Sequence, residues 1–249
     1  MKLVLITALG VGGATLIGAL IGFAFRKISH KLTDVLMGFA AGVMLCAAVI
    51  GLILPSLEGG ERWSLPLTVI GIFCGALFLN VIDKAVPHLH RLAGTEFEKH
   101  SNAKLNKILL FVMAIAIHNF PEGIAAGVGF GTGDVSGAIS IALGIALQNI
   151  PEGMVVIAPM LSVGVSKKNT LIIALITGFI EVIGTLIGYM AVSVSAAILP
   201  FALAFAGGTM LYVISDEMIP ETHAHGNERA STYSLIVGFC LMLVMDYIL

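Results

Sequence analysis

The chain has 249 residues, of which 58% are hydrophobic and only 11% are charged, and its formal net charge at pH 7 is -2. A soluble domain has about 45–50% apolar and about 25% charged residues, so the composition excludes an ordinary soluble protein. No basic run suggests a nucleic-acid partner, and Cys46, Cys74 and Cys240 form neither a disulfide framework nor a zinc ribbon. We therefore expect one membrane domain over residues 1–249, with the lipid bilayer as its surroundings.

Eight apolar runs follow one another along the chain, each about as long as a transmembrane helix. The first, Met1–Phe25, exceeds a signal-peptide core and ends at Arg26, so we interpret it as a span. The other runs lie near residues 34–57, 66–86, 107–129, 136–160, 170–190, 197–219 and 233–249. The runs are continuous rather than alternating, which favours helices over a barrel. The sequence predicts an all-α polytopic membrane protein with a bundle of eight transmembrane helices.

Basic residues predict the orientation of this bundle. If the amino terminus is outside, all of the 13 Lys and Arg residues except Lys2 and Arg62 face the cytoplasm. Positive charge favours the cytoplasmic side, so both termini are expected outside. The longest connection, about residues 87–106, is then a cytoplasmic loop, either a solvated linker or a site of transient metal capture. Its candidate ligands are His88, His90 and His100.

Acidic residues lie in the predicted spans without basic partners, because no Lys or Arg occurs at positions 108–166 or 169–228. A charge at bilayer depth costs about 2.5–3.5 kcal/mol, so such acids need a proton, water or a bound cation. A bound cation is the economical solution for the acids near the middle of their spans, Glu122, Glu152 and Glu181. Simple protonation remains an equal alternative for those near span ends, Asp216, Glu217 and Asp246.

Two related motifs occupy the fourth and fifth spans: HNFPEG at residues 118–123 and QNIPEG at residues 148–153. In each motif the first residue and the glutamate are four positions apart, so they share one helix face. The prolines remove a backbone donor and free a helical carbonyl beside the glutamate. Imidazole, carboxylate and amide groups suit a divalent transition metal such as zinc, iron, manganese or cadmium. The candidate ligands are His118, Glu122, Gln148 and Glu152.

These doubled motifs, in eight spans with the termini outside, resemble the ZIP metal transporters, and bacterial members above all. The resemblance covers nearly the whole chain. It implies uptake of zinc or related divalent metals across the bacterial inner membrane, with the metal as substrate and no cofactor. It also implies a first metal position made by His118, Glu122, Gln148 and Glu152, and a second made by Asn119, Glu122, Asn149, Glu152 and Glu181.

Three positions depart from the family pattern. Many members have His at the position of Gln148, some have Asp at that of Asn149, and members often have His at that of Asp216. Glu58 and Asp246, near the outer ends of the second and eighth spans, match entrance acids of some members. Asp216 and Glu217, at the inner end of the seventh span, are candidate exit residues.

Two other classes of protein compete with a transporter: an intramembrane metalloenzyme and a metal-sensing receptor. Neither the HExxH motif of zinc hydrolases nor paired Glu-x-x-His units of di-iron proteins occur, and no output domain is recognised. Related motifs on consecutive antiparallel helices predict an approximate two-fold arrangement around the site, as in inverted-repeat transporters. The sequence thus favours a transporter, and leaves open the preferred metal, carrier or channel behaviour, and assembly as a homodimer.

Overall fold

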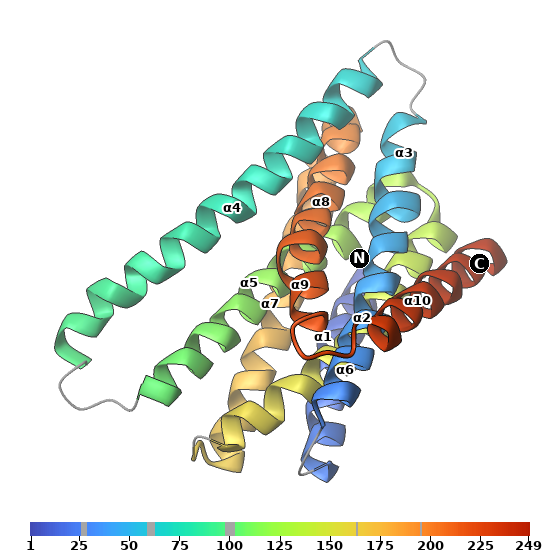
Figure 1. The fold of residues 1–249 in the computed structure, drawn as a ribbon. Helices are drawn as coiled ribbons and strands as arrows, with labels where there is room; N and C mark the ends of the chain where they lie inside the picture. Colours follow the sequence, from blue (N-terminus) through green and yellow to red (C-terminus); the bar gives the residue numbers. More distant parts are fainter. Residues whose placement is uncertain (26–28, 59–62, 98–102, 163, 195) are drawn as a thin grey trace.

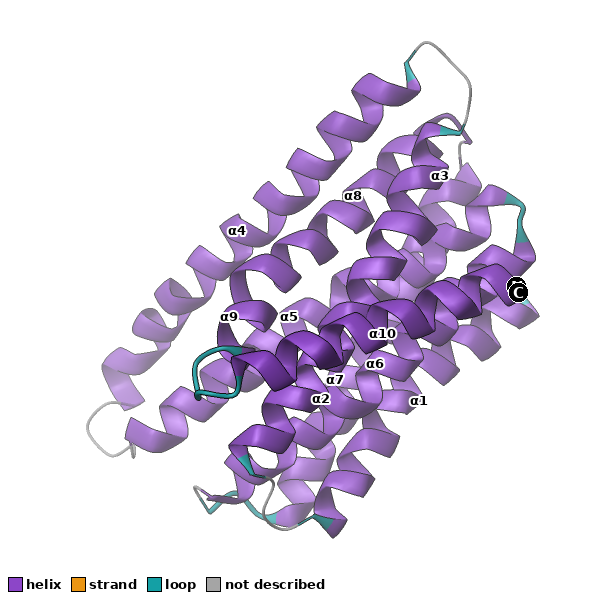
Figure 2. Cartoon of the chain, turned by 45° about the vertical axis from the view of Figure 1, so that its right-hand side comes forward, coloured by secondary structure: helices purple, strands orange, loops and turns teal. Residues whose placement is uncertain are grey.

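The computed structural model describes residues 1–25, 29–58, 63–97, 103–162, 164–194 and 196–249; at positions 83, 85–97, 103–115 and 196 it describes the backbone alone. This part of the chain is helical and contains no strand (Figure 2). His100 lies outside the described residues. His88 and His90 fall within a helix, but their side chains are outside the description as well.

The helices follow the predicted spans in order (Figure 1). They are α1 (Lys2–Ala24), α2–η1–α3 (His30–Cys46, Ala47–Ile53, Leu54–Leu57), α4 (Ser64–Phe97), α5 (Ala103–Gly129), α6 (Val135–Ser162), α7 (Lys167–Val194), α8–η4–α9 (Leu199–Val213, Ile214–Met218, Ile219–Thr222) and α10 (Glu228–Ile248). Short 3-10 turns, η2 (Phe130–Thr132) and η3 (Ala196–Ile198), precede α6 and α8. Among the described residues, 7 helical units are long and apolar enough to cross a membrane. With α5, the 27-residue helix that holds the first motif, the predicted all-α polytopic fold is confirmed.

The connection between the third and fourth spans differs from the sequence-based expectation. Instead of a loop over residues 87–106, α4 continues to Phe97 and α5 begins at Ala103. A helix need not end where the hydrocarbon ends, because polar side chains of good helix propensity can extend it into water. The side of the membrane on which this segment lies stays a prediction.

The bundle is organised by four extensively packed helix pairs: α1 with α6, α7 with α5, α2 with α10, and α8 with α4. These pairs are related by symmetry. If α1, α2 and α4 are exchanged with α7, α8 and α10, and α5 is exchanged with α6, the pair α1–α6 becomes α7–α5. The pair α2–α10 likewise becomes α8–α4. Figure 1 shows α4 along the outer side of the molecule, with α8 beside it. The pairing agrees with the predicted two-fold relation and places both motifs at its centre.

Glycines bring the backbones of these pairs into direct contact beside the motifs. A Cβ atom added to Gly153 of α6 would lie 2.2 Å from the carbonyl oxygen of Thr15 in α1. A Cβ added to Gly123 of α5 would lie 2.3 Å from the carbonyl oxygen of Glu181 in α7. Small residues permit such close approach of membrane helices. The motif helices are thereby fixed against α1 and α7.

Two π-helical segments, η1 and η4, occupy equivalent places in the second and seventh spans. In each, the residue before a proline donates its N–H to a carbonyl five residues back: Leu54 to Val49, and Ile219 to Ile214. The prolines that follow lack an N–H and cannot restore the α-helical pattern. Because π-segments often mark functional sites, the acidic pair Asp216 and Glu217 within η4 is a structural signal in its own right.

Candidate metal centre

The motif side chains lie in the interior of the bundle, where α5 and α6 meet α1 and α7. Glu122, Gln148 and Asn149 are 0% exposed, Asn119 is 1% exposed and Glu152 is 7% exposed. Helix α5 packs against α6, and both pack against α1 and α7. His118 of the first motif and Glu152 of the second line the same cavity. The structure therefore brings the two motifs together, as their sequence similarity predicted.

Polar side-chain atoms at this position are buried without hydrogen-bond partners in the described part of the protein. They are both carboxylate oxygens of Glu122, both side-chain polar atoms of Gln148, the Oδ1 atoms of Asn119 and Asn149, and Nε2 of His118. Each unsatisfied buried polar group costs about 1–3 kcal/mol. Such a concentration of unpaired groups indicates a binding site rather than a structural hydrogen-bond network.

Among the described residues, no Lys or Arg side chain forms an ion pair with the buried glutamates. The ion-pair contact at the motifs joins Nε2 of His118 to Oε2 of Glu217, which are 2.7 Å apart without the alignment of a hydrogen bond. The other described ion pair, between His225 and Asp34, lies at the start of α2. A divalent cation would supply the missing positive charge between Glu122 and Glu152, because buried charges otherwise remain uncompensated.

Glu181 differs from the other glutamates because its carboxylate is hydrogen-bonded. Thr15 Oγ1 donates to Oε1 at 2.8 Å, Asn119 Nδ2 donates to the same oxygen at 2.5 Å, and Asn149 Nδ2 donates to Oε2 at 2.6 Å. Both asparagines therefore turn their amide nitrogens toward Glu181. Thr15, in the first helix, was absent from the residues singled out in the sequence.

Histidine and carboxylate side chains alone do not complete the site. Among the described residues, no group of three or more His, Cys, Asp or Glu side chains lies close enough together to hold a metal ion. The neighbouring donors that could complete a coordination shell are the amide oxygens of Gln148, Asn119 and Asn149, which are unpartnered. A mixed set of imidazole, carboxylate and amide ligands suits a borderline divalent ion such as Zn²⁺.

A cavity of about 480 Å³ connects this position with one end of the bundle; we call it the His118 cavity. His118 and Glu152 lie in its wall, and it reaches exposed residues at Asp216, Glu221 and Ala224. Glu217 lines it as well. The candidate exit residues Asp216 and Glu217 thus border the path between the motifs and this surface, although their transport role stays a prediction.

A second cavity, of about 380 Å³, lies at the other end of α10; we call it the Asp246 cavity. Ala224, in the turn before α10, borders the first cavity, whereas Asp246, near the end of α10, borders the second. The candidate entrance acids Glu58 and Asp246 share the second cavity with Asp134, an acid that the sequence analysis did not single out. None of the motif residues lines it.

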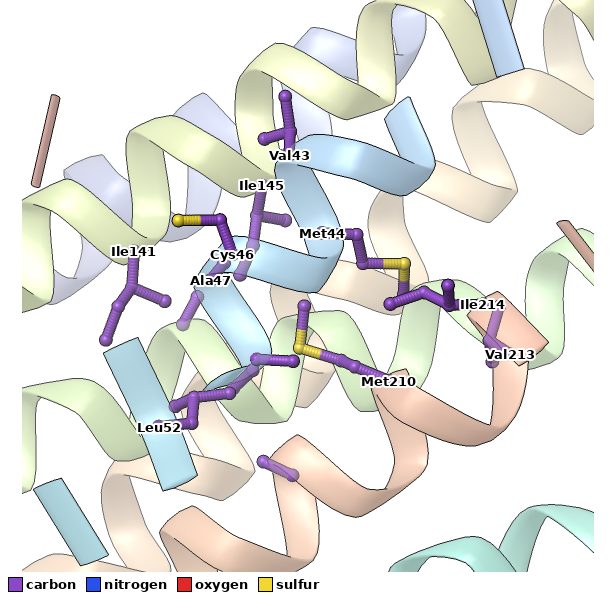
Figure 3. Close-up of a cluster of buried hydrophobic side chains, with 14 of the residues drawn as sticks. Val43, Met44, Cys46, Ala47, Leu52, Ile141, Ile145, Met210, Val213 and Ile214 are labelled. Atoms are coloured by element: carbon purple, nitrogen blue, oxygen red, sulfur yellow. The ribbon is translucent and has the colours of Figure 1, made fainter. Parts of the chain in front are cut away.

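A cluster of buried hydrophobic side chains (Figure 3) has members in the walls of both cavities. It includes Ile141, which borders the Asp246 cavity, and Met218, which borders the His118 cavity. Between them pack side chains from α2, η1, α6 and α8, among them Met44, Leu52, Ile145 and Met210. Of these two cavities of the described residues, only the His118 cavity has motif residues in its wall, and the hydrophobic cluster packs between them.

Fold and site together define a class: a polytopic membrane protein with a buried, acidic polar centre that communicates with one end of a helix bundle. A family model described as "ZIP Zinc transporter" matches residues 104–246, more than half of the chain. The chain belongs to the ZIP family. This membership favours a transporter over the metalloenzyme and the receptor that were weighed from the sequence.

Curated relatives cover nearly the whole chain. The zinc transporter GufA of Myxococcus xanthus is 43% identical over 248 residues, which are 97% of each chain. The zinc transporter ZIPB of Bordetella bronchiseptica is 36% identical over 94% of this chain and 77% of its own. The zinc transporter ZupT of Chlorobaculum parvum is 34% identical over 94% of this chain and 92% of its own. The similarity extends through both motifs and their flanking helices.

Proposed function

We propose that this protein transports Zn²⁺ or a closely related divalent ion into the cytoplasm across a bacterial inner membrane. The observation that carries the proposal is the set of buried, unpartnered polar atoms around Glu122, with no Lys or Arg paired to them among the described residues. The similarity to proteins named zinc transporters agrees with it. The ion is the substrate, and the chemistry requires no resident cofactor.

In this proposal His118, Glu122, Gln148 and Glu152 form the first metal position. The two glutamates supply two negative charges, which balance one divalent ion. The imidazole and the amide replace part of its water shell. The second position implied by the family pattern would involve Asn119, Asn149 and Glu181 beside the same glutamates.

The two cavities supply a path. Glu58, Asp134 and Asp246 attract cations at the outer end, since carboxylates around a cavity concentrate positive ions. The hydrophobic cluster must open for the ion to reach the motifs. Glu217, already in contact with His118, and the exposed Asp216 then receive it on the cytoplasmic side. Such alternate opening around a fixed site is carrier behaviour.

Zinc uptake by the purified protein in liposomes tests this proposal. Wild-type protein should accumulate more radioactive zinc than empty liposomes do. Cadmium, iron and manganese, each added in excess over zinc and at the same free concentration as one another, should reduce zinc uptake in the order of their affinities. Purified protein that binds zinc but moves none would contradict the proposed function. That outcome would favour a receptor.

Topology is tested by cysteine labelling in a background that lacks the three native cysteines. We expect a cysteine at Asp134 to react with a membrane-impermeant reagent in intact cells, and one at Ser166 to react only after permeabilisation. Both positions are exposed, and they lie at opposite ends of α6. The reverse pattern would invert the proposed orientation and direction of transport.

We also propose that the outer surface of the bundle contacts lipid and a second copy of the chain. Exposed apolar side chains such as Phe73 and Leu77 on α4 suit either partner. Mass measurement in detergent distinguishes a monomer from the proposed homodimer. His88, His90 and His100 stay proposed capture ligands in the connection between α4 and α5.

A further inference from the structure

Asp34 is a buried acid that lies outside the metal centre and that the proposed transport path does not use. It belongs to the second turn of α2, and only 1% of its surface is exposed. Among the described residues, it is not part of any group of three or more possible metal ligands. Burying a carboxylate is costly unless partners satisfy it, so its position needs an explanation other than metal binding.

The partners of Asp34 come from the turn that joins α9 to α10. Its Oδ1 lies 3.0 Å from Nδ1 of His225, and its Oδ2 accepts a hydrogen bond from Asn227 Nδ2 at 2.9 Å. A carboxylate accepts hydrogen bonds only, so Nδ1 of His225 carries the proton. The His225 ring also stacks on His30, with the ring centroids 4.7 Å apart. We call Asp34, His225 and Asn227 the Asp34 clamp.

The clamp fastens two parts of the wall of the His118 cavity to each other. Gly226, between the two donors, has a φ of +79°, a left-handed conformation that glycine adopts without strain and that lets the chain reverse. Ala224, in the same turn, borders the cavity, and so does Met37, about one helical turn beyond Asp34 in α2. Loss of the clamp would therefore free one wall of the cavity from another.

The turn also continues directly from the segment that carries Glu217. Pro220 follows the π-helical segment η4 and lacks an N–H, so η4 depends on its neighbours for its position. Among these neighbours is α2, which packs against both η4 and α9. Nδ1 of His223 lies 2.8 Å from the carbonyl oxygen of Ile219 and joins the turn to α9. Through α9 the clamp supports Glu217, whose Oε2 lies 2.7 Å from Nε2 of His118.

We propose that Asp34 is a positioning residue for metal release, because the Asp34 clamp holds η4, and with it Glu217, at the wall of the His118 cavity. The inference rests on the proposed function, in which Glu217 receives the ion from the motifs. Asp34 itself does not contact the ion. Without the clamp, the turn separates from α2, Glu217 moves away from His118, and the ion leaves the site more slowly. A satisfied buried carboxylate suits this task, because its directional hydrogen bonds select one arrangement of the turn.

Zinc uptake by purified variants in liposomes tests the proposal. Asp34→Ala removes both acceptors, and we expect the maximal uptake rate to fall about tenfold, within the range of couplings between connected segments. The half-saturating Zn²⁺ concentration should stay unchanged, because a step after binding is slowed. Asp34→Asn should retain more of the rate, because it still offers one acceptor to His225 and the Asn227 amide can turn to accept from its nitrogen. If Asp34→Ala does not fold, His225→Ala replaces it with the same expectations.

Ser234→Ala is the matched control. Ser234 Oγ donates to the carbonyl oxygen of Val35 at 2.6 Å, so this variant also removes a hydrogen bond between α10 and α2, but one outside the turn. We expect both variants to lower the melting temperature and only Asp34→Ala to slow uptake. Equal uptake rates per folded protein in Asp34→Ala and Ser234→Ala would show that Asp34 acts on stability alone, and would overturn the inference.

A double-mutant cycle tests whether Asp34 acts through Glu217. Glu217→Gln removes the charge that the clamp is proposed to position, so adding Asp34→Ala to it should slow uptake little further. Fully additive effects would mean that Asp34 acts by another route, which contradicts the proposal.

Thiol labelling gives a readout that does not depend on transport. In a background without the native cysteines, a cysteine at Met37 should react faster with a membrane-impermeant reagent when Asp34→Ala is present, since the turn no longer holds the cavity wall. Ser234→Ala should leave this rate unchanged. An unchanged rate in Asp34→Ala would overturn the inference. Failure of the proposed function appears instead as absent zinc uptake by wild-type protein, whatever the labelling shows.

Discussion

Glu122→Ala and Glu152→Ala will each lower zinc uptake in liposomes at least about 100-fold, since even outer-shell changes at metal sites cost about 10–100-fold. Each substitution removes one of the two charges proposed to balance the ion. Its partner carboxylate cannot compensate alone, because a divalent ion in a buried site then carries uncompensated charge. His118→Ala should also be severe, since it removes the imidazole that joins the motifs to Glu217.

The Glu122→Ala variant should fold well. Both oxygens of Glu122 are buried without hydrogen-bond partners, so alanine removes an unsatisfied group rather than a supporting contact. We expect the melting temperature of metal-free protein to stay the same or rise, because an unpaired buried group costs about 1–3 kcal/mol. Loss of transport without loss of stability is the signature of a ligand.

Glu228→Ala is the matched control, because Glu228 is an exposed acid at the start of α10, away from both cavities. It should transport at the wild-type rate. If folded Glu122→Ala or Glu152→Ala did the same, that residue would not be a metal ligand, and the charge argument for the site would fail.

Much of the fold could be predicted because each predicted span has the length and composition needed to cross the hydrocarbon core. The length of each apolar run follows from the thickness of the bilayer, so all eight spans could be identified from the run lengths. The end of α4 could not be predicted in this way, because residues beyond the apolar run may be helix or loop with the same hydropathy. The π-segments also escaped prediction, since a proline signals a break but does not say how the preceding turn adapts.

The centre of the site followed from the doubled motif, since only a shared task explains glutamates at the same place in two membrane helices. Its surroundings did not follow. Thr15 is an ordinary residue in a small-residue helix, and it gains meaning only where α1 crosses Glu181. The contact of His118 with Glu217 likewise joins residues far apart in the sequence. The orientation of the Asn119 and Asn149 amide groups also depends on a residue distant in the sequence, because both donate to Glu181.

Gly123→Ala and Gly153→Ala are expected to have the second large effect, on stability as well as on transport. The added methyl group would meet a backbone carbonyl at 2.3 Å or 2.2 Å, and a backbone atom cannot rotate out of the way. The helices α5 and α7, or α1 and α6, must then separate. Overpacking of this kind costs about 1–3 kcal/mol, so the melting temperature of the purified protein should fall.

Gly13→Ala is the control, because no described atom beyond its own stretch of helix lies within 4 Å of the position its Cβ would take. It adds the same methyl group to the same type of helix and should leave both melting and uptake unchanged. Wild-type melting in Gly153→Ala would show that α1 and α6 are not held this closely.

Transport should be more sensitive than folding to the separation of these helices. Gly153 contacts the backbone of Thr15, and Gly123 contacts that of Glu181, the two residues whose side chains meet at 2.8 Å. Moving either backbone outward lengthens hydrogen bonds that hold the amides of Asn119 and Asn149. Zinc uptake should therefore be lost at temperatures where circular dichroism still reports a folded helical protein. Uptake and folding that decline together would instead indicate that the glycines act on stability alone.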